Sequence, residues 1–235
     1  MAILRSVKQT ILVPIHPAGY PFIAIAVFIT LLLTYIFSPY LTFVGIIISL
    51  WCVYFFRNPI RYTPQNENLV ISPADGRILS VKKCLPPENL GLEGTNWTKI
   101  SIFMNIFDVH VNRAPMAGKI IKKTYFPGSF LDASLDKASE KNERLGLVMA
   151  TKNGKNIGFV QIAGLIARRI ICDISEGSVI KCGEQYGIIR FGSRVDVWLP
   201  NTIFIRVLVG QRTYAGETIL ADFEPASELG EVRLE

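Results

Sequence analysis

Histidine and cysteine are scarce in this chain of 235 residues. It has two histidines, His16 and His110, and four cysteines that form no Cys-x-x-Cys pair. Zinc sites draw their ligands from closely spaced Cys and His, so no metal site is predicted. A P-loop, a dinucleotide fingerprint and a Gly-x-Ser-x-Gly nucleophile elbow are also missing. The sequence therefore lacks the usual signatures of nucleotide-dependent enzymes and of serine hydrolases.

Charge is absent from forty consecutive residues, Pro17 to Phe56. Two apolar runs, Tyr20–Ile36 and Tyr40–Phe56, lie in this stretch on either side of a Ser-Pro link. Each is close to the lower limit of about 17–25 residues for a helix that spans a bilayer. A signal peptide has one apolar core and a cleavage site, which does not fit. We predict an N-terminal membrane helical hairpin; the alternative is a buried hairpin in a soluble protein.

The flanks of the apolar stretch are basic. Arg5 and Lys8 precede it, and Arg57 and Arg61 follow it, which predicts that both ends of the hairpin face the cytoplasm. The chain has a net charge of +6. No basic run is interleaved with aromatic residues, so nucleic acid is not an expected partner. A basic protein beside a membrane is attracted to anionic lipid headgroups, so lipid is the expected partner.

After the hairpin, short β-rich runs recur, with Gly, Pro, Asn or Asp in nearly every gap. This pattern predicts a mainly β (α+β) fold, an antiparallel barrel or sandwich, in residues 63–235, with the anchoring hairpin in residues 1–62. The polar segment 129–146 is expected to be a loop with helical turns. The expected strands include 69–72, 76–83, 98–104, 118–126, 146–152, 158–164, 168–174, 186–192, 194–200, 202–210 and 217–223.

Three short motifs carry candidate chemistry. His110 is the only histidine of the β-rich part, with Asp108 and Arg113 near it in sequence, and it is either catalytic or structural. Asp75 lies in a Pro-Ala-Asp-Gly turn, which turn geometry alone would explain. Ser193 follows Gly192 between two apolar strands. A glycine permits close approach to its carbonyl, and a serine hydroxyl is a nucleophile once a base activates it.

Taken jointly, several blocks resemble the phosphatidylserine decarboxylase family in its short, pyruvoyl-dependent form. The blocks are SPADGRI, FMNIFDVHVNRAP, YFPGSF, KNERLGLVM, GFVQIAGLIARRI, GEQYGIIRFGSRVDVWLP and AGETIL. They occur in the family's order from the hairpin to about residue 222, and none would be specific alone.

The resemblance implies a carboxy-lyase that makes its own cofactor from a precursor chain, or zymogen. Ser193 attacks the Gly192 carbonyl, and autocatalytic cleavage between them gives a β chain (1–192) and an α chain (193–235). Ser193 becomes an N-terminal pyruvoyl group, whose ketone forms a Schiff base with the substrate amine and accepts the electrons left by CO₂. The implied reaction converts phosphatidylserine into phosphatidylethanolamine, a step of phospholipid biosynthesis.

The resemblance also assigns supporting residues. Asp75 matches the family's aspartate and His110 the first of two histidines that longer members carry three residues apart. Arg113 stands where their second histidine, a base for self-cleavage, would be. An arginine is not deprotonated in proteins, so Arg113 cannot be that base. Asp75 or His110 would take over, or Arg113 would bind an oxyanion or the substrate carboxylate.

Further expectations follow from the resemblance. The two chains would stay associated as a heterodimer, with a higher oligomer left open, at the cytoplasmic face of the cell membrane. Two alternatives also fit the sequence. One is an ether-lipid (archaetidylserine-type) decarboxylase, and the other is a non-enzymatic two-pass membrane protein with a lipid-binding β-domain.

Overall fold

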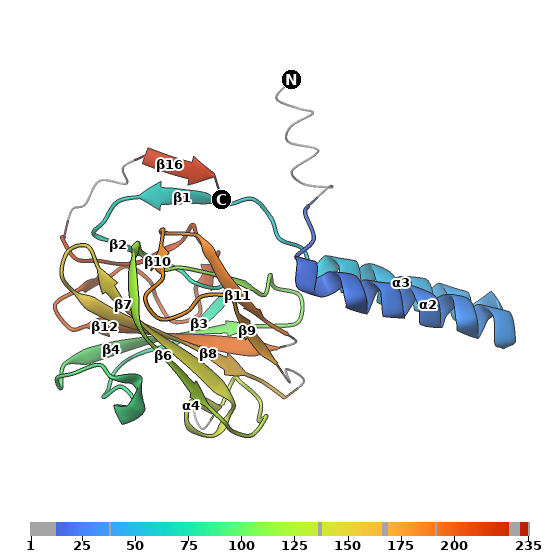
Figure 1. Ribbon diagram of the computed structural model, residues 1–235, viewed down its shortest axis with the longest axis horizontal. Coiled ribbons are helices and arrows are strands. Elements are labelled where there is room, and N and C mark those ends of the chain that lie inside the picture. The colour runs from blue at the N-terminus through green and yellow to red at the C-terminus, as the bar shows by residue number, and fades with distance from the viewer. Residues whose placement is uncertain are drawn as a thin grey trace. The chain divides into compact units, whose positions relative to one another are not determined.

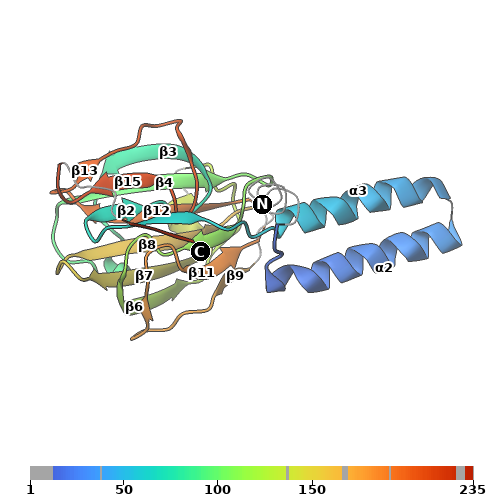
Figure 2. The ribbon, with the colours of Figure 1, turned by 90° about the horizontal axis from the view of Figure 1, so that it is seen from above.

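The chain divides into two compact units, Met1–Ile60 and Arg61–Glu235. The computed structural model describes residues 13–37, 39–135, 138–165, 169–190, 192–225 and 231–234. Arg5 and Lys8, used above for the orientation of the hairpin, lie outside the described residues. Helices form the first unit, and strands dominate the second (Figures 1 and 2).

The first unit is a helical hairpin. A short 3-10 helix, η1 (Pro17–Gly19), leads into α2 (Tyr20–Ile36). The second helix, α3 (Pro39–Phe55), runs back beside α2 (Figure 2). Both predicted helices are therefore present, within a residue of the expected ends.

Small and hydroxyl-bearing residues join α2 to α3. A Cβ added to Gly45 would collide with Thr30, so the two helices approach closely at this point. Thr34 Oγ1 lies 2.8 Å from Thr42 Oγ1. Contacts of this kind are typical of helices packed inside a bilayer.

The outer surface of the hairpin is apolar. Many large side chains are exposed on it, among them Tyr35, which is 91% exposed, and Phe28, which is 65% exposed. By length and composition, Pro17–Ile36 could cross a membrane, whereas the apolar segment Tyr40–Phe55 is shorter. These features favour membrane association of the first unit.

The second unit consists of short strands with two helical turns, η2 (Glu88–Leu90) and α4 (Ala138–Lys141). The strands are β1 (Tyr62–Gln65), β2 (Leu69–Ile71), β3 (Gly76–Lys83), β4 (Trp97–Met104), β5 (Val111–Arg113), β6 (Gly118–Phe126), β7 (Arg144–Thr151), β8 (Asn156–Ala163), β9 (Ile170–Cys172), β10 (Val179–Ile180), β11 (Gln185–Ile189), β12 (Ser193–Pro200), β13 (Phe204–Ile205), β14 (Arg212–Thr213), β15 (Ile219–Asp222) and β16 (Glu231–Leu234).

One large sheet dominates this unit. Its eight strands follow the order β10-β6-β7-β8-β12-β4-β3-β14. All neighbours are antiparallel, and the sheet curls into a half-barrel (Figure 1). Two three-stranded sheets, β5-β11-β9 and β13-β15-β2, and the pair β1-β16 complete the unit. The predicted mainly β, antiparallel fold with an N-terminal helical hairpin is confirmed.

Strand β12 lies in the middle of the large sheet and is buried on both faces. Alternate residues point to opposite sides of a strand. Val195, Val197 and Leu199 belong to the main core on the inner face, whereas Trp198 packs in a smaller cluster on the outer face. The residue at the start of β12 is therefore held by two neighbouring strands and a core.

One expected strand is much shorter than predicted. The apolar run 202–210 contributes only β13, Phe204–Ile205, to a sheet. Val207 is buried in the core, but Leu208 and Val209 are 77% and 63% exposed in the turn that follows. Apolar composition alone does not separate a strand from a loop of which one residue is buried.

Candidate active site

Ser193 is the first residue of β12 and pairs with Met104 of β4 and Ala163 of β8. Its side chain is fully buried. Among the residues that the structure describes, Ser193 Oγ has no hydrogen-bond partner. A buried hydroxyl without a partner costs about 1–3 kcal/mol, and such exceptions in a native fold call for a functional explanation.

Gly192 has the left-handed backbone angle φ = 62°. An added Cβ would meet nothing closer than Ile106 Cγ2 at 4.0 Å, so the conformation, not lack of space, requires glycine here. A second glycine, Gly164, lies against the Gly192 carbonyl, because a Cβ on Gly164 would collide with that oxygen. The two glycines let the backbone at residue 164 pack on the carbonyl that precedes Ser193.

His110 lies directly beside this peptide. Its ring is fully buried, and Nδ1 lies 2.9 Å from the Asp108 carbonyl oxygen. The Gly192 amide donates a hydrogen bond of 3.3 Å to His110 Nε2. A carbonyl can only accept, so Nδ1 carries the proton and Nε2 is the acceptor. The structure thus brings together His110 and the Gly192–Ser193 step.

Asp75 is buried in an ion pair. Arg61 Nη2 donates to both carboxylate oxygens, at 2.9 and 2.7 Å, and the Ala215 amide donates to Oδ1 at 2.7 Å. Burial raises the pKa of the Asp75 carboxyl, and the charge of Arg61 opposes that rise. Within the described part of the chain, no hydrogen bond joins Asp75 to Ser193.

Arg113 is buried as well, on β5. Its Nη1 donates a 3.0 Å hydrogen bond to the Gly183 carbonyl oxygen. A Cβ on Gly216 would lie 3.0 Å from Arg113 Cδ, so that glycine packs closely on the side chain. These contacts join Arg113 to two turns.

Two buried amides near Ser193 were missed by the sequence analysis. Gln161 Nε2 donates to Asn112 Oδ1 at 2.8 Å, and Asn112 Nδ2 lies 3.6 Å from Met104 Sδ, across from Ser193. Gln161 precedes Ala163 by two residues, so both share the inner face with Ser193. Gln161 Oε1 has no partner among the described residues. A lone glutamine in the apolar run GFVQIAG was the available signal.

Arg194 points to the outer face of the sheet, opposite to Ser193. Its guanidinium bonds Asp196 through Nε (2.6 Å) and Nη2 (3.2 Å), Ser101 Oγ through Nη2 (2.7 Å) and the Leu135 carbonyl through Nη1 (3.4 Å). All of these partners except Leu135 are buried. Arg194 therefore anchors the start of β12 from the outer face of the sheet.

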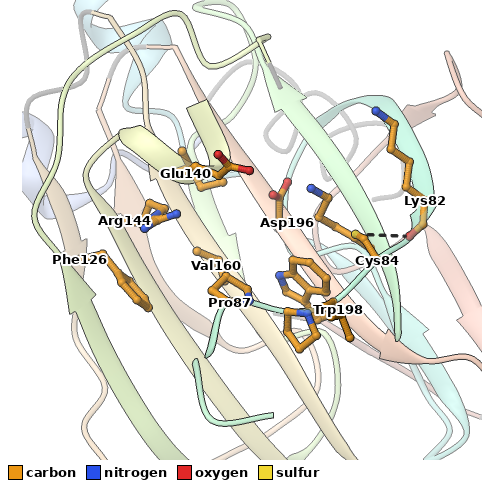
Figure 3. Close-up of a pocket in the computed structure, with 13 residues that line it drawn as sticks. Lys82, Cys84, Pro87, Phe126, Glu140, Arg144, Val160, Asp196 and Trp198 are labelled. Carbon is orange, nitrogen blue, oxygen red and sulfur yellow. Dashed lines mark hydrogen bonds between the residues drawn. The ribbon is translucent and has the colours of Figure 1, made fainter. Parts of the chain in front are cut away.

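A cavity of about 520 Å³ lies on that outer face. Figure 3 shows Asp196, Trp198 and Arg144 in its wall. Burial lowers the pKa of the Arg144 guanidinium. Ser193 faces the other side of the sheet, so this cavity is separate from the Gly192–Ser193 step. It is also lined by Lys82, Cys84, Leu85, Pro86, Pro87, Lys99, Phe126, Glu140, Val160 and Ile162.

Metal-binding groups do not gather anywhere in the described part of the chain. No cluster of three or more His, Cys, Asp or Glu is present there. No disulfide bond joins Cys52, Cys84, Cys172 and Cys182, all of which lie in the described part of the chain. The polar groups that the structure brings together at this site are His110 and the Gly192–Ser193 step.

Comparison with known proteins defines the class of this chain as a decarboxylase. The family model described as phosphatidylserine decarboxylase matches residues 48–221. A relative, the phosphatidylserine decarboxylase proenzyme of Rickettsia akari (strain Hartford), is 55% identical over 209 residues, which cover 89% of this chain and 90% of the relative. The chain belongs to the phosphatidylserine decarboxylase family. The predicted family and the predicted enzyme class are confirmed, and a non-enzymatic role is excluded.

Proposed function

We propose that this decarboxylase converts phosphatidylserine into phosphatidylethanolamine and CO₂, with a pyruvoyl group that it makes from Ser193. The observation that carries the proposal is the hydrogen bond from the Gly192 amide to His110 Nε2. It holds a proton acceptor beside the peptide that must break. The unpartnered Ser193 hydroxyl and the close packing of Gly164 on the Gly192 carbonyl fit the same reaction.

Self-cleavage begins with an acyl shift. His110 Nε2 takes the hydroxyl proton while Ser193 Oγ attacks the Gly192 carbonyl carbon. The peptide C–N bond breaks, its nitrogen takes a proton and becomes the amine of Ser193, and Gly192 is left as an ester on Oγ. A positioned general base contributes about 10²–10⁴-fold to such a step.

Elimination then separates the chains. A base removes the Cα proton of residue 193, the Cβ–Oγ bond breaks, and Gly192 leaves as a carboxylate. Water replaces the amine of the resulting dehydroalanine, which releases ammonia and leaves a ketone. We assign the base to His110, because the described contacts of Asp75 and Arg113 are with Arg61, Ala215 and Gly183.

The pyruvoyl group would supply the electron sink for decarboxylation. The protein's own residues would shape the rest of the site. Met104 and Ala163 flank residue 193 with buried apolar side chains and keep water from the reacting carbon. His110 Nε2, protonated during cleavage, is placed to return a proton.

The cleaved pieces would stay together without a covalent link. β12, in the α chain, is hydrogen-bonded on both sides to β4 and β8 of the β chain. The Ala215 amide of the α chain also donates to Asp75 of the β chain. These contacts support a stable heterodimer of the two chains. They are also compatible with a higher oligomer.

The hairpin α2–α3 would hold the enzyme at the cytoplasmic face of the cell membrane. Its exposed apolar surface and the basic Arg57 that follows α3 support this location. An enzyme anchored in this way would stay next to its substrate and its product, which are both membrane lipids.

Mass spectrometry of the purified protein tests the mechanism. We expect two chains, 1–192 and 193–235, and an α chain whose N-terminus reacts with carbonyl reagents. Ser193→Ala should leave one inactive 26.2 kDa chain. Ser80→Ala is the matched control, because Ser80 Oγ is also buried without a partner among the described residues, but on β3.

Two results would contradict the proposal: a Ser193→Ala protein that still decarboxylates phosphatidylserine, or a wild-type chain that stays intact in an active preparation. An ether-linked serine lipid, assayed in parallel, separates the archaetidylserine alternative from the ester-lipid reaction.

A further inference from the structure

The turn between β4 and β5 carries His110. It leaves β4 after Met104, which pairs with Ser193, and it reaches His110 directly before β5. Two hydrogen bonds close the turn: the Asp108 amide donates to the Asn105 carbonyl oxygen at 3.0 Å, and the Asn105 amide donates to Asp108 Oδ2 at 2.9 Å. The Asp108 carbonyl oxygen lies 2.9 Å from His110 Nδ1. The shape of this turn therefore determines where the His110 ring is held.

The Asp108 carboxylate is buried and is paired with a cation from a distant part of the chain. Its side chain is 1% exposed, and Oδ1 lies 2.7 Å from Nη2 of Arg212 on β14. The two carboxylate oxygens thus accept from two different donors, Oδ1 from Arg212 and Oδ2 from the Asn105 amide. Because an unpaired buried carboxylate is costly, loss of Arg212 would make Asp108 take up a proton or leave the turn. Arg212 therefore stabilises the turn that carries His110.

The strand of Arg212 fixes this arginine in turn. The next residue, Thr213, pairs with Gly76 of β3, and its hydroxyl donates to the Ala74 carbonyl oxygen at 3.1 Å. The guanidinium lies over the ring of Tyr214, 5.7 Å from the ring centroid. These contacts orient an arginine whose side chain is 46% exposed.

We propose that Arg212 is a positioning residue for His110. Through the Asp108 carboxylate it holds the turn, and the carbonyl oxygen of the turn keeps the ring proton on Nδ1. Nε2 is thereby directed at the Gly192 amide. The inference rests on the proposed function in one respect, because the position of Nε2 matters for self-cleavage only if His110 is the base. Arg212 lies in the proposed α chain and Asp108 in the β chain, so the ion pair would position the ring after the cut as well.

Self-cleavage rates of two Arg212 variants test the inference. Arg212→Met should slow cleavage by about 10–10²-fold, since a small displacement of a reacting group has effects of this size. Arg212→Lys should keep most of the wild-type rate. The contact with Asp108 joins one nitrogen to one oxygen, and an ammonium group can make it as well.

Arg206→Met is the matched control. Arg206 Nη2 lies 3.2 Å from Asp222 Oδ2, and the exposed fractions of these two side chains are 42% and 3%. This ion pair therefore resembles the pair of Arg212 and Asp108 in its type and burial, but it lies on β15 and the loop before it. Arg206→Met should cleave at the wild-type rate.

Asp108→Asn breaks the ion pair without leaving a buried charge, and it replaces Arg212→Met if that variant does not fold. An asparagine has one acceptor oxygen, so it cannot satisfy both Arg212 and the Asn105 amide from two sides. Cleavage should slow about as much as in Arg212→Met. The double variant should be no slower than either single variant, because both remove the same interaction. Thermal melting of each variant checks that it is folded.

The protonation of the His110 ring gives a readout that does not depend on cleavage. In an uncut Ser193→Ala chain, His16→Gln leaves His110 as the only histidine. With ¹⁵N-labelled histidine, in detergent micelles and at a pH where the ring is neutral, nitrogen NMR shows which ring nitrogen carries the proton. We expect the proton on Nδ1 in this background and with Arg206→Met added. With Arg212→Met added, we expect a mixture of the two neutral forms.

A proton that stays on Nδ1 in Arg212→Met would overturn the inference, whether cleavage is slow or not, because Arg212 would then not act through the ring. Losses of rate that multiply in the double variant would overturn it as well, since the two residues would act independently. A mixture of ring forms together with slow cleavage supports both the positioning and the proposed base. A mixture of ring forms with wild-type cleavage would support the positioning alone and would refute His110 as the base of the proposed function.

Discussion

Two neighbouring residues of β12 are buried in opposite ways. Ser193 faces the inner core, where its hydroxyl has no partner among the described residues. Arg194 faces the outer side, where its guanidinium makes four hydrogen bonds. Burial of a charge costs so much free energy that the charge must be paired. Burial of a hydroxyl without a partner costs much less, and such a hydroxyl is not engaged in another interaction. The strand is held firmly on its outer face, whereas its inner face carries a hydroxyl without a partner among the described residues.

The paired groups also connect the two predicted chains. Arg194 of the α chain bonds Ser101 and Leu135 of the β chain. Asp75 of the β chain bonds the Ala215 amide of the α chain and the Arg61 side chain. Each ion pair lies within one predicted chain, and its additional hydrogen bonds reach the other chain. Both can therefore hold the two chains together after the proposed cut, which the predictions below test.

Removal of the base should give the largest effect. His110→Gln keeps a polar side chain but removes the proton acceptor at Nε2, so self-cleavage should slow by about 10²–10⁴-fold. The fraction of cut chain over time, measured by gel densitometry, gives the rate. His16→Gln, which changes the other histidine, is the control and should cleave normally. Cleavage of His110→Gln at the wild-type rate would assign the base elsewhere.

Loss of Arg194 should mainly affect stability. In an uncut Ser193→Ala background, Arg194→Met leaves Asp196 buried without its cation and should lower the free energy of unfolding by about 4–5 kcal/mol. Denaturant unfolding measures this change. The double variant with Asp196→Leu should recover much of the loss, because it removes the isolated charge. If the two substitutions destabilise additively, the ion pair is not the anchor proposed here.

Arg61→Met tests the second ion pair, which is slightly less buried, with an expected loss of about 3 kcal/mol at neutral pH. Burial already raises the pKa of Asp75, and without Arg61 that pKa should rise further. A carboxyl group whose pKa is raised in the folded state adds to the stability of the protein below its unfolded pKa, about 3.9. That contribution is lost as the pH rises through the folded pKa. The variant should therefore lose more stability than the wild type between pH 4 and neutrality.

Unfolding curves at several pH values provide the measurement for Arg61→Met. Arg61→Lys keeps the positive charge and should retain most of the wild-type pH profile. A variant whose deficit is the same at every pH would show that Arg61 acts through packing and not through the charge of Asp75.

Local patterns in the sequence predicted the elements but not the contacts between them. The predicted helices match the structure because a charge-free apolar run of about 17 residues is too long for a strand and forms a helix. Strands such as 76–83 and 118–126 match because alternating apolar residues and turn signals are local. The strand predicted for 202–210 was wrong over most of its length because its burial is not a local property. Val207 is buried in the core through contacts with residues far away in sequence.

The candidate site divides along the same line. Gly192, Ser193 and His110 were singled out from short motifs, and the structure brings them together. The ion pair of Asp75 with Arg61 and the bond between Gln161 and Asn112 join residues 14 and 49 positions apart. Tertiary packing determines such partners. A single sequence therefore allows a residue to be singled out but does not predict which distant residue it contacts.

The buried amide pair offers the smallest and most specific test of the reactive face. Gln161→Leu removes a bond to Asn112 and the unpartnered Oε1 on the face that Ser193 shares. A lost hydrogen bond of about 1–1.5 kcal/mol should slow self-cleavage about tenfold, with little change in thermal stability. Gln185→Leu, at an exposed position on β11, is the control for the substitution itself. Because His110 would still accept the proton, cleavage in Gln161→Leu should keep the wild-type pH dependence, and a shifted profile would mean that the amide pair acts on His110 instead of on the orientation of Ser193.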